Sequence, residues 1–494
     1  MTEPLAATSN PDAQPYFKRA INLFDAIMLV TGSMIGSGIF IVSADIARKV
    51  GSAGWLLVVW LLTGVITMAG AISYGELASM FPKVGGQYVY LREAFGRLTA
   101  FLYGWTLFLV IQTGVIAAVA VAFAKFTGVL LPFFSVKHIL FTVGSFEFSS
   151  VQLLAIALIV GITALNAQGV RTGKLIQNVL GSTKLVALGL LIVLGVALGL
   201  NAQAIAANFH DLWTASRHAA PGTLLPTVPI SGGTLVVAIG MAMTGSLFSS
   251  DSWNNIGFAG EEIQNPERTL VRSMAMGTAI VTVLYILINV VYLLVLPLQG
   301  SPDAATLAGR GIMYATDDRV ATAVAESVLG RAGAYVMAVL IMLSTFGANN
   351  GIILSGARAY YAMAKDGLFF PGLARLNGAG VPSRALWAQC LWACLLCLSG
   401  KYGQLLDYVM FSVILFYVVT IIGIFVLRRT RPEAPRPYRA WGYPVVPGLY
   451  VLLASAFCII LLFAPDTAEF SRRGLGLMAL GLPVYFLFGR RFKA

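Results

Sequence analysis

Long hydrophobic stretches, separated by short polar connections, recur along the whole chain. Most of them reach the roughly 18 to 20 residues that a helix needs to cross the ~30 Å hydrocarbon core of a bilayer. They are continuously apolar rather than alternating, which disfavours a transmembrane β-barrel. The pattern predicts an all-α integral membrane protein with twelve transmembrane helices, at residues 22–49, 54–80, 98–125, 151–169, 175–200, 233–260, 270–298, 332–363, 384–399, 405–427, 445–464 and 475–491.

The composition supports this prediction. Of the 494 residues, 58% are hydrophobic and 11% are charged, and the mean hydropathy is +0.82, which leaves no room for a soluble domain. Residues 1–20 are polar and do not resemble a cleaved signal peptide, so we expect a cytoplasmic N-terminal tail. The cysteines lie in apolar stretches and the histidines in predicted external loops. We therefore expect no disulfide framework, metal site or cofactor.

The formal net charge of +12 does not indicate a nucleic-acid partner. The Lys and Arg residues lie in the short connections between the predicted helices, most densely in RRTRPEAPRPYR at 428–439. Cytoplasmic connections of membrane proteins carry such an excess of positive charge. We therefore expect both termini on the cytoplasmic side of the cell's inner (cytoplasmic) membrane.

Glycines interrupt the first predicted helix, where residues 32–40 read GSMIGSGIF. One explanation is close helix packing through small residues. The other is local unwinding, because glycine leaves a helix at little cost and gives a ligand access to the backbone. The sixth predicted helix has a second irregular stretch, GSLFSSDSWNN at 245–255, whose serine and aspartate side chains compete for backbone hydrogen bonds. Two such helices, five positions apart, are typical of transporters built from inverted repeats.

Unwinding at both places would suit an α-amino acid, which carries both of its charges on one carbon. The start of the outer half-helix would offer free N–H groups to the carboxylate, as other helix N-termini do to anions. These belong to Gly36, Ser37 and Gly38. The ammonium would bind carbonyl groups released at the two interruptions, namely those of Met34, Ile35, Phe248, Ser249 and Asp251.

Four segments resemble the amino acid–polyamine–organocation superfamily, and most closely its L-type amino acid transporter family with the prokaryotic relatives of that family. They are GSMIGSGIF (32–40), YGELASMFPKVGGQYVYLREAFG (74–96), DSWNNIGFAGEEIQNPERTL (251–270) and STFGANNGIILSGARAYYAMAKDGLFF (344–370). In the second segment, FPKVGGQYVYLREAFG resembles the family's short cytoplasmic re-entrant loop. An ordinary amphipathic connector is the alternative.

The resemblance implies a LeuT-type fold. It would consist of a first repeat of five helices (21–203), an external loop (204–232), an inverted second repeat of five helices (233–430), and two further helices with the C-terminus (431–494). It implies alternating access, with the carboxylate on Gly36, Ser37 and Gly38 and with Phe248 closing over the substrate. Further candidates for the pocket, which are as often structural in packed helices, are Gln112, Thr113, Ser250, Trp253, Asn254 and Asn349.

Two features depart from the family. Many animal members pair with a glycoprotein through a cysteine between the third and fourth helices, and residues 126–150 contain no cysteine. We therefore expect no disulfide-linked heavy chain. Ser250, Asp251 and Ser252 stand where several members have glycine or an aromatic residue in the sixth helix, which leaves the substrate preference open.

Lys184 is predicted to lie some ten residues inside the fifth helix, about 15 Å from its start. A lysine at that depth costs ~2.5–3.5 kcal/mol on insertion scales, which favours a functional role over snorkelling to the surface. The resemblance implies that Lys184 takes the place of a sodium ion in ion-coupled members, between Gly32 and Ser344. Transport would then not depend on sodium, although such a lysine could also carry a proton.

Asp251 is the other charge of interest within the predicted membrane region. It either caps the second half of the sixth helix or contacts a substrate ammonium, which would favour amines or cationic amino acids. We expect Glu76, Glu261 and Glu262 to make cytoplasmic gate or loop contacts.

These features predict a secondary transporter that exchanges neutral L-amino acids independently of sodium, with a proton-coupled amino acid or polyamine permease as the alternative. A channel or receptor would need a continuous polar stripe or a large external ligand-binding domain. An enzyme would need catalytic groups that converge. The sequence shows none of these features.

Overall fold

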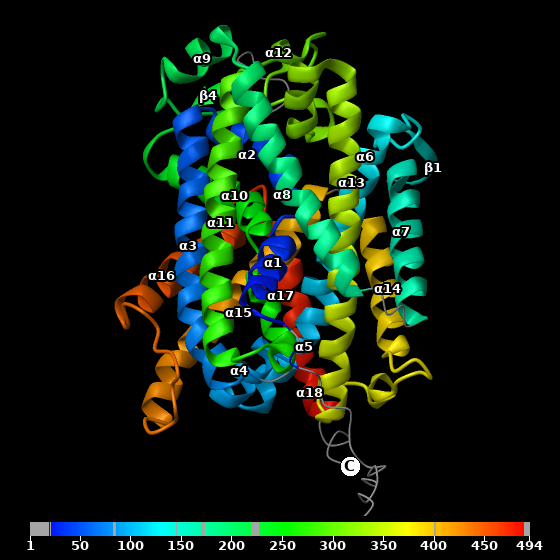
Figure 1. Ribbon diagram of the computed structural model, residues 1–494, viewed down its shortest axis with the longest axis vertical. Coiled ribbons are helices and arrows are strands. Elements are labelled where there is room, and N and C mark those ends of the chain that lie inside the picture. Colours follow the sequence, from blue (N-terminus) through cyan, green and yellow to red (C-terminus); the bar gives the residue numbers. More distant parts are fainter. Residues whose placement is uncertain are drawn as a thin grey trace, which may run out of the picture.

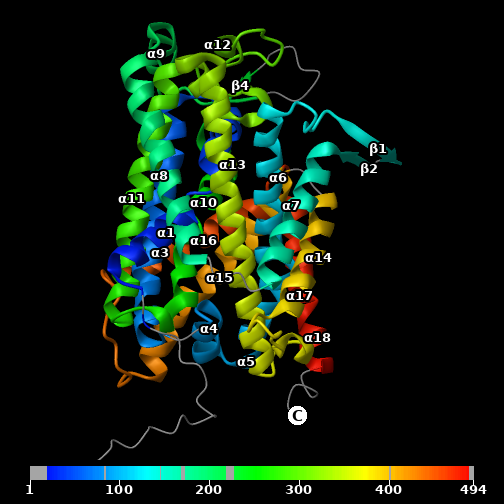
Figure 2. The ribbon, with the colours of Figure 1, turned by 45° about the vertical axis from the view of Figure 1, so that its right-hand side comes forward.

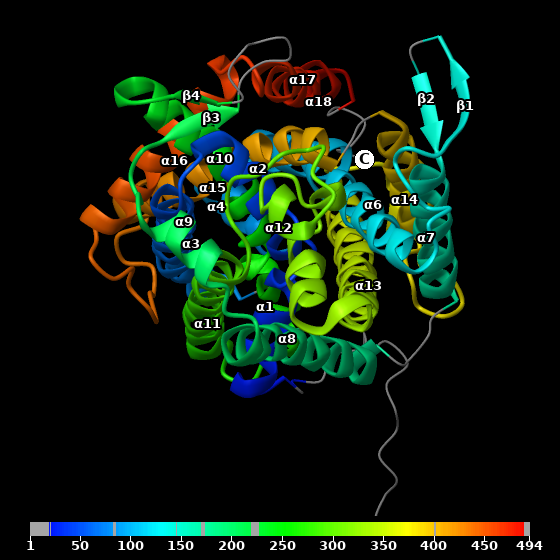
Figure 3. The same ribbon diagram turned by 90° about the horizontal axis from the view of Figure 1, so that it is seen from above.

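The computed structural model describes residues 19, 21–82, 85–144, 146–168, 173–218, 227–399 and 402–488. Most of the predicted N-terminal tail lies outside this description. The described helices form an elongated bundle, with α9 and α12 at one end and α4, α5 and α18 at the other (Figure 1). A hairpin of β1 and β2 projects at the α9 end (Figure 2). Seen from that end, the long helices surround α1, α2 and α10 (Figure 3).

The described helices and strands follow one another in a fixed order. They are α1 (Leu23–Met34), η1 (Gly38–Phe40), α2 (Val42–Val50), α3 (Ala53–Met80), α4 (Gln87–Phe95), α5 (Arg97–Thr106), the π-helical turn η2 (Leu107–Ile111), α6 (Gln112–Leu130), β1 (Ile139–Val143), β2 (Phe146–Ser149), α7 (Ser150–Ala167), α8 (Gly173–Leu198), α9 (Ala202–Phe209), β3 (Ser216–His218), β4 (Thr227–Pro229), α10 (Gly232–Ser249), η3 (Trp253–Glu262), α11 (Pro266–Val295), α12 (Leu307–Arg310), η4 (Thr316–Asp318), α13 (Val320–Lys365), η5 (Pro371–Ala374), α14 (Ser383–Ser399), α15 (Tyr402–Thr430), α16 (Val445–Phe463), α17 (Ala468–Ala479) and α18 (Gly481–Phe488).

Eight helices of the described chain are long and apolar enough to cross a membrane. A ninth span results if Lys184–Leu198 and Ala202–Phe209, which meet at 102°, are taken together. Two apolar helices are shorter, Leu23–Met34 and Ser383–Leu398. This is a multi-pass membrane protein, and large apolar side chains such as Val65 and Leu391 face outward, 56% and 67% exposed, as expected for contact with lipid.

The predicted last span, 475–491, is wrong as a single helix. The chain forms α17 and then α18, with the division at Leu480. Gly481 packs closely against Trp105, where an added Cβ would lie 2.8 Å from the indole ring. Pro483 then falls in the first turn of α18, where its missing N–H interrupts no helical hydrogen bond.

The segment 85–96 is a buried helix and not an amphipathic surface connector. The first five residues of α4 are at most 4% exposed, and α4 packs against α15. Tyr88 donates a hydrogen bond of 2.9 Å to Asp366 at the end of α13, and Arg92 lies 2.6 Å from the same carboxylate. Burial, and secondarily the Asp366 charge, raise the pKa of Tyr88, so its phenol stays protonated and donates.

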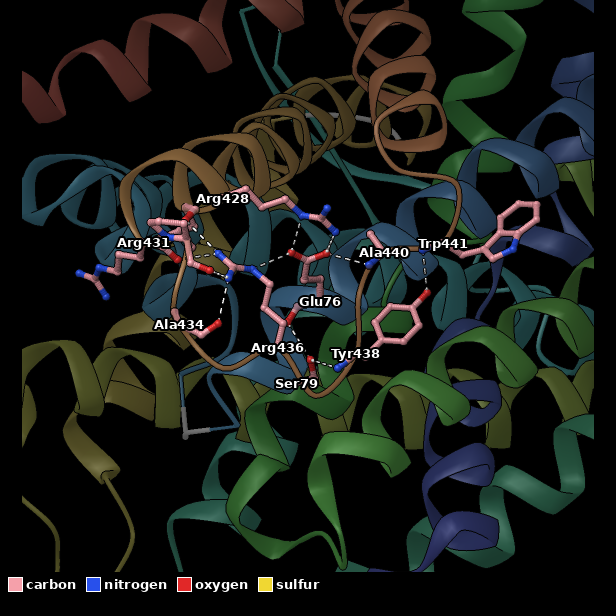
Figure 4. Close-up of polar contacts among 11 residues, drawn as sticks. Glu76, Ser79, Arg428, Arg431, Ala434, Arg436, Tyr438, Ala440 and Trp441 are labelled. Carbon is pink, nitrogen blue, oxygen red and sulfur yellow. Dashed lines mark hydrogen bonds and ion pairs between the residues drawn. The ribbon is translucent and has the colours of Figure 1, made fainter.

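Glu76 fastens the end of α15 and the segment after it to α3 (Figure 4). Its side chain is 1% exposed and accepts two hydrogen bonds from Arg428, of 2.9 and 2.6 Å. The N–H of Ala440 donates to it at 2.7 Å, and Arg436 lies 3.4 Å away. The Arg428 guanidinium also stacks on the Tyr443 ring. Part of the basic cluster that predicted topology is therefore structural, and we call residues 428–444 the strap.

Of the other two glutamates expected in loop contacts, Glu262 lies 3.7 Å from Arg358. The side chain of Glu261 lies outside the described residues. Together with Arg92 and Glu76, the Glu262 pair belongs to a layer of charges at the end of the bundle opposite α9.

Candidate functional site

The first predicted helix is interrupted at its glycines. The helix α1 ends at Met34, Ile35 is extended with ψ of 90°, and a regular helix resumes only at α2. Among the described residues, the N–H groups of Gly36 and Gly38 have no hydrogen-bond acceptor. They are therefore donors that a ligand can use.

The sixth predicted helix is interrupted as well. The helix α10 ends at Ser249, and Ser252 has a left-handed conformation with φ of 72° before η3 begins. The two interruptions touch: a Cβ added to Gly38 would lie 2.0 Å from Ser249 Oγ. At Gly36 it would meet nothing closer than the Met34 carbonyl oxygen, at 4.0 Å. Gly38 is thus required for packing, whereas Gly36 faces open space.

Tyr285 of α11 joins the two half-helix ends. Its hydroxyl, in a side chain only 1% exposed, lies 3.1 Å from the Met34 carbonyl oxygen and 3.0 Å from that of Ser249. These carbonyls end α1 and α10, where the helix dipoles are negative. Both were expected to bind an ammonium, and each already accepts from Tyr285.

Asp251 lies beside a small cavity and binds a tyrosine. Its Oδ1 accepts a 2.6 Å hydrogen bond from Tyr417 of α15, whose hydroxyl also lies 3.1 Å from Asn254 Oδ1. No cationic side chain pairs with Asp251 within the described part of the chain. The cavity has a volume of about 30 Å³, enough for one water molecule, and its lining also includes Gln87 and Gln112.

The other predicted pocket residues differ in whether they line this cavity, as Gln112 and Asn254 do. Gln112 lines the small cavity and donates to the Ile352 carbonyl at 2.6 Å. Thr113 is fully buried and donates to the Phe108 carbonyl across the π-helical turn. The remaining candidates are buried without lining that cavity, and they are Met34, Ile35, Phe248, Ser249, Ser250, Trp253 and Asn349.

Lys184 contacts the first interrupted helix. Its Nζ donates a 2.7 Å hydrogen bond to the Gly32 carbonyl, and the side chain is 2% exposed. Ser344 is also buried, but its hydroxyl has no hydrogen-bond partner among the described residues, Lys184 included. The lysine therefore ties α8 to α1 directly, and no hydrogen bond joins it to Ser344 of α13 within the described part of the chain.

A second cavity, of about 900 Å³, extends from the β1 end of the bundle to the start of α2 and the last turns of α10. Its outer wall includes Lys137 and Glu147 of the β1–β2 region. Its inner wall includes Val42, which begins α2, and Thr244, which lies five residues before the end of α10. The cavity thus extends toward the two interruptions from this end, while the charged layer around Glu76 lies at the other.

The sequence profile of the amino acid permease family matches residues 21–483. The chain belongs to the amino acid permease family. It is 31% identical over 488 residues to the large neutral amino acids transporter small subunit 2 of Rattus norvegicus, covering 98% of this chain and 84% of the relative. It is 30% identical over 477 residues to the b(0,+)-type amino acid transporter 1 of Mus musculus, covering 95% and 88%. The resemblance to this class of transporters is confirmed, and the permease is not an enzyme.

The two tyrosines of this permease's site were missed by the sequence analysis. Tyr285 and Tyr417 lie in long apolar helices, where a tyrosine is also an ordinary core residue. Each of these tyrosines forms a hydrogen bond with a residue far away in the sequence, so the spacing of residues along the chain does not indicate the contact.

The substitutions Gly36→Ala and Gly38→Ala test two separate roles of these glycines, substrate binding at Gly36 and helix packing at Gly38. We expect Gly38→Ala to prevent α10 from packing against η1, and to lower both the yield of folded permease and its melting temperature. Gly36→Ala meets no atom, so the permease should fold normally while substrate affinity falls about tenfold, because a methyl group crowds the free N–H donors. Melting temperature and substrate binding, measured on both variants, check this. Unchanged affinity in Gly36→Ala would contradict a role of this amide.

Proposed function

We propose that this permease exchanges neutral L-amino acids across the cytoplasmic membrane by alternating access, independently of sodium. The observation that carries the proposal is the contact between the two interruptions at Gly38 and Ser249. It brings unpaired backbone donors of one half-helix next to the carbonyl end of another, within an otherwise apolar bundle. A ligand with adjacent negative and positive groups fits this arrangement.

In this proposal the substrate carboxylate binds the N–H groups at Gly36, Ser37 and Gly38, at the positive end of the outer half-helix. The ammonium binds the carbonyl oxygens of Met34 and Ser249. Each of these oxygens has a second lone pair beyond the one used by Tyr285. Phe248 closes over the substrate from α10.

The two ends of the bundle support alternating access. The 900 Å³ cavity leads from the β1 end toward the interruptions, and the charged layer with Arg92, Asp366 and Glu76 lies at the other end. With the β1 end outside and both termini in the cytoplasm, this is an outward-open state. The proposal includes twelve spans in a LeuT-type arrangement of two inverted repeats and two further helices, and no disulfide-linked heavy chain.

Cationic amino acids or polyamines are the second candidate substrates. Asp251 favours them, because its carboxylate borders the small cavity and is held by a neutral tyrosine. Coupling to protons is the corresponding alternative mechanism, with Lys184 as the buried group that would carry the proton.

Counterflow in proteoliposomes tests the proposed function. We expect efflux of preloaded labelled leucine only when an amino acid is present outside, and no change when choline replaces sodium. Competition by the twenty amino acids and common polyamines should single out the neutral amino acids. Equal efflux into empty buffer would rule out obligatory exchange, and selective competition by lysine or spermidine would favour the second candidate.

A further inference from the structure

We propose that Asp407 is a separate binding station for the amino group of an incoming substrate, inside the 900 Å³ cavity and before the interrupted helices. This inference rests on the proposed function and extends it to the path of entry. Asp407 belongs to α15, close to its β1 end, and its partly buried side chain lines the cavity.

The other charges near Asp407 are already paired. Lys49 lies 2.8 Å from Asp45 and also donates to the Met241 carbonyl. Asp466 lies 2.7 Å from Arg217. Both pairs border Asp407, and each is neutral as a whole. Asp407 therefore contributes a surplus negative charge to this part of the cavity.

A second cavity-lining charge, Arg48, is committed elsewhere. Its guanidinium lies 2.8 Å from Asp318 and donates to the Met313 carbonyl at 2.6 Å. Within the described residues, no cation lies within ion-pair distance of Asp407. A charged group at membrane depth without a partner is costly, so an incoming cation is favoured there.

Thr244 supplies a second acceptor beside Asp407. Its side chain is 2% exposed and lines the same cavity, and its buried hydroxyl lies next to the Asp407 carboxylate, with no partner at hydrogen-bond distance among the described residues. An ammonium group has three donors and no acceptor. A carboxylate with a hydroxyl beside it, on the contacting helices α15 and α10, offers acceptors to such a group and does not match a carboxylate.

The position along α15 makes Asp407 an earlier stop on the same path. Asp407 precedes Tyr417 by ten residues, which is about 15 Å along a helix. Tyr417 holds Asp251 at the small cavity. An amino group that leaves Asp407 still has to move toward the interruptions. Because the large cavity has its outer wall at the β1 end, Asp407 acts on substrate from that side.

The test is the sidedness of affinity in Asp407→Asn. Permease is reconstituted in one orientation, and leucine exchange is measured with labelled leucine added on the β1 side or on the opposite side. We expect the ratio of the two KM values, β1 side over opposite side, to rise about tenfold, as for loss of a hydrogen bond to a charged group. Asp407→Glu should keep the wild-type ratio. The matched control is Asp303→Asn, an exposed carboxylate at the same end that does not line the cavity, which should also keep it.

Thr244→Val provides an independent variant that leaves every charge in place, and the KM ratio should rise about threefold. A ratio unchanged in both Asp407→Asn and Thr244→Val would overturn the station, as would an equal rise of KM from both sides. If wild-type permease shows no counterflow with any amino acid, the proposed function fails instead, and this outcome is distinguishable because it appears before any substitution is made.

Discussion

Replacing Glu76 by glutamine should lower the free energy of unfolding by about 3–5 kcal/mol, the largest stability effect that we expect in this permease. Glu76 is 1% exposed and neutralises Arg428, with Arg436 close by at 3.4 Å. Glutamine cannot compensate either cation, and the guanidinium groups of Arg428 and Arg436 would remain without a negative partner among the described residues. Thermal unfolding in detergent, followed by tryptophan fluorescence, measures the loss.

The control for Glu76 is Glu93→Gln. Glu93 pairs with Arg431 of the same strap at 2.9 Å, but these side chains are 25% and 49% exposed. Exposed pairs contribute at most about 1 kcal/mol. Adding Arg428→Met to Glu76→Gln should restore part of the stability, because one unpaired charge disappears. A loss no larger than that of Glu93→Gln would show that the strap is not held by this carboxylate.

Transport by Lys184→Met should fall at least about tenfold, since the variant loses a charged hydrogen bond. The substitution keeps an apolar side chain of similar length but removes the ammonium that holds the Gly32 carbonyl at 2.7 Å. Gly32 lies in the last turn of α1, so the interruption that follows loses a fixed boundary. Uptake and melting temperature are measured in parallel, because only a change in uptake larger than the change in folded fraction supports a role in transport.

Lys365→Met is the matched control, since Lys365 is an exposed lysine at the end of α13. Wild-type permease should transport equally in sodium and choline buffers. Normal uptake by Lys184→Met across a range of pH would contradict the role of Lys184 as a substitute for a sodium ion, whatever the effect of the substitution on stability.

The backbone features of the site could be predicted from the sequence because they are local. Gly36, Gly38 and the run of polar residues around Asp251 act on their own segment of chain, and the structure interrupts both helices there. The length and apolar character of α3, α11 and α15 are local in the same sense.

The contacts between distant segments could not be predicted in this way. The pairing of Glu76 with Arg428 joins residues 352 positions apart, and that of Asp251 with Tyr417 joins residues 166 apart. From charge and hydropathy along the chain, the arginines of the strap could be explained as signals of topology, and nothing in the sequence indicated that some of them pair with Glu76. The division between α17 and α18 likewise depends on the fit of Gly481 against Trp105, which only the packed structure supplies.

The bond pattern of Tyr285 has a consequence for how the two half-helices stay together when no substrate is bound. A phenol has one hydrogen, and here it is shared between the last oxygens of two separate half-helices. Any movement that separates these half-helices must break the hydrogen bond between Tyr285 and one of the two carbonyl oxygens. A protonated amine that binds at that moment can donate a hydrogen bond to the carbonyl oxygen that Tyr285 has left. The substrate itself would then offset the free-energy cost of separating the half-helices.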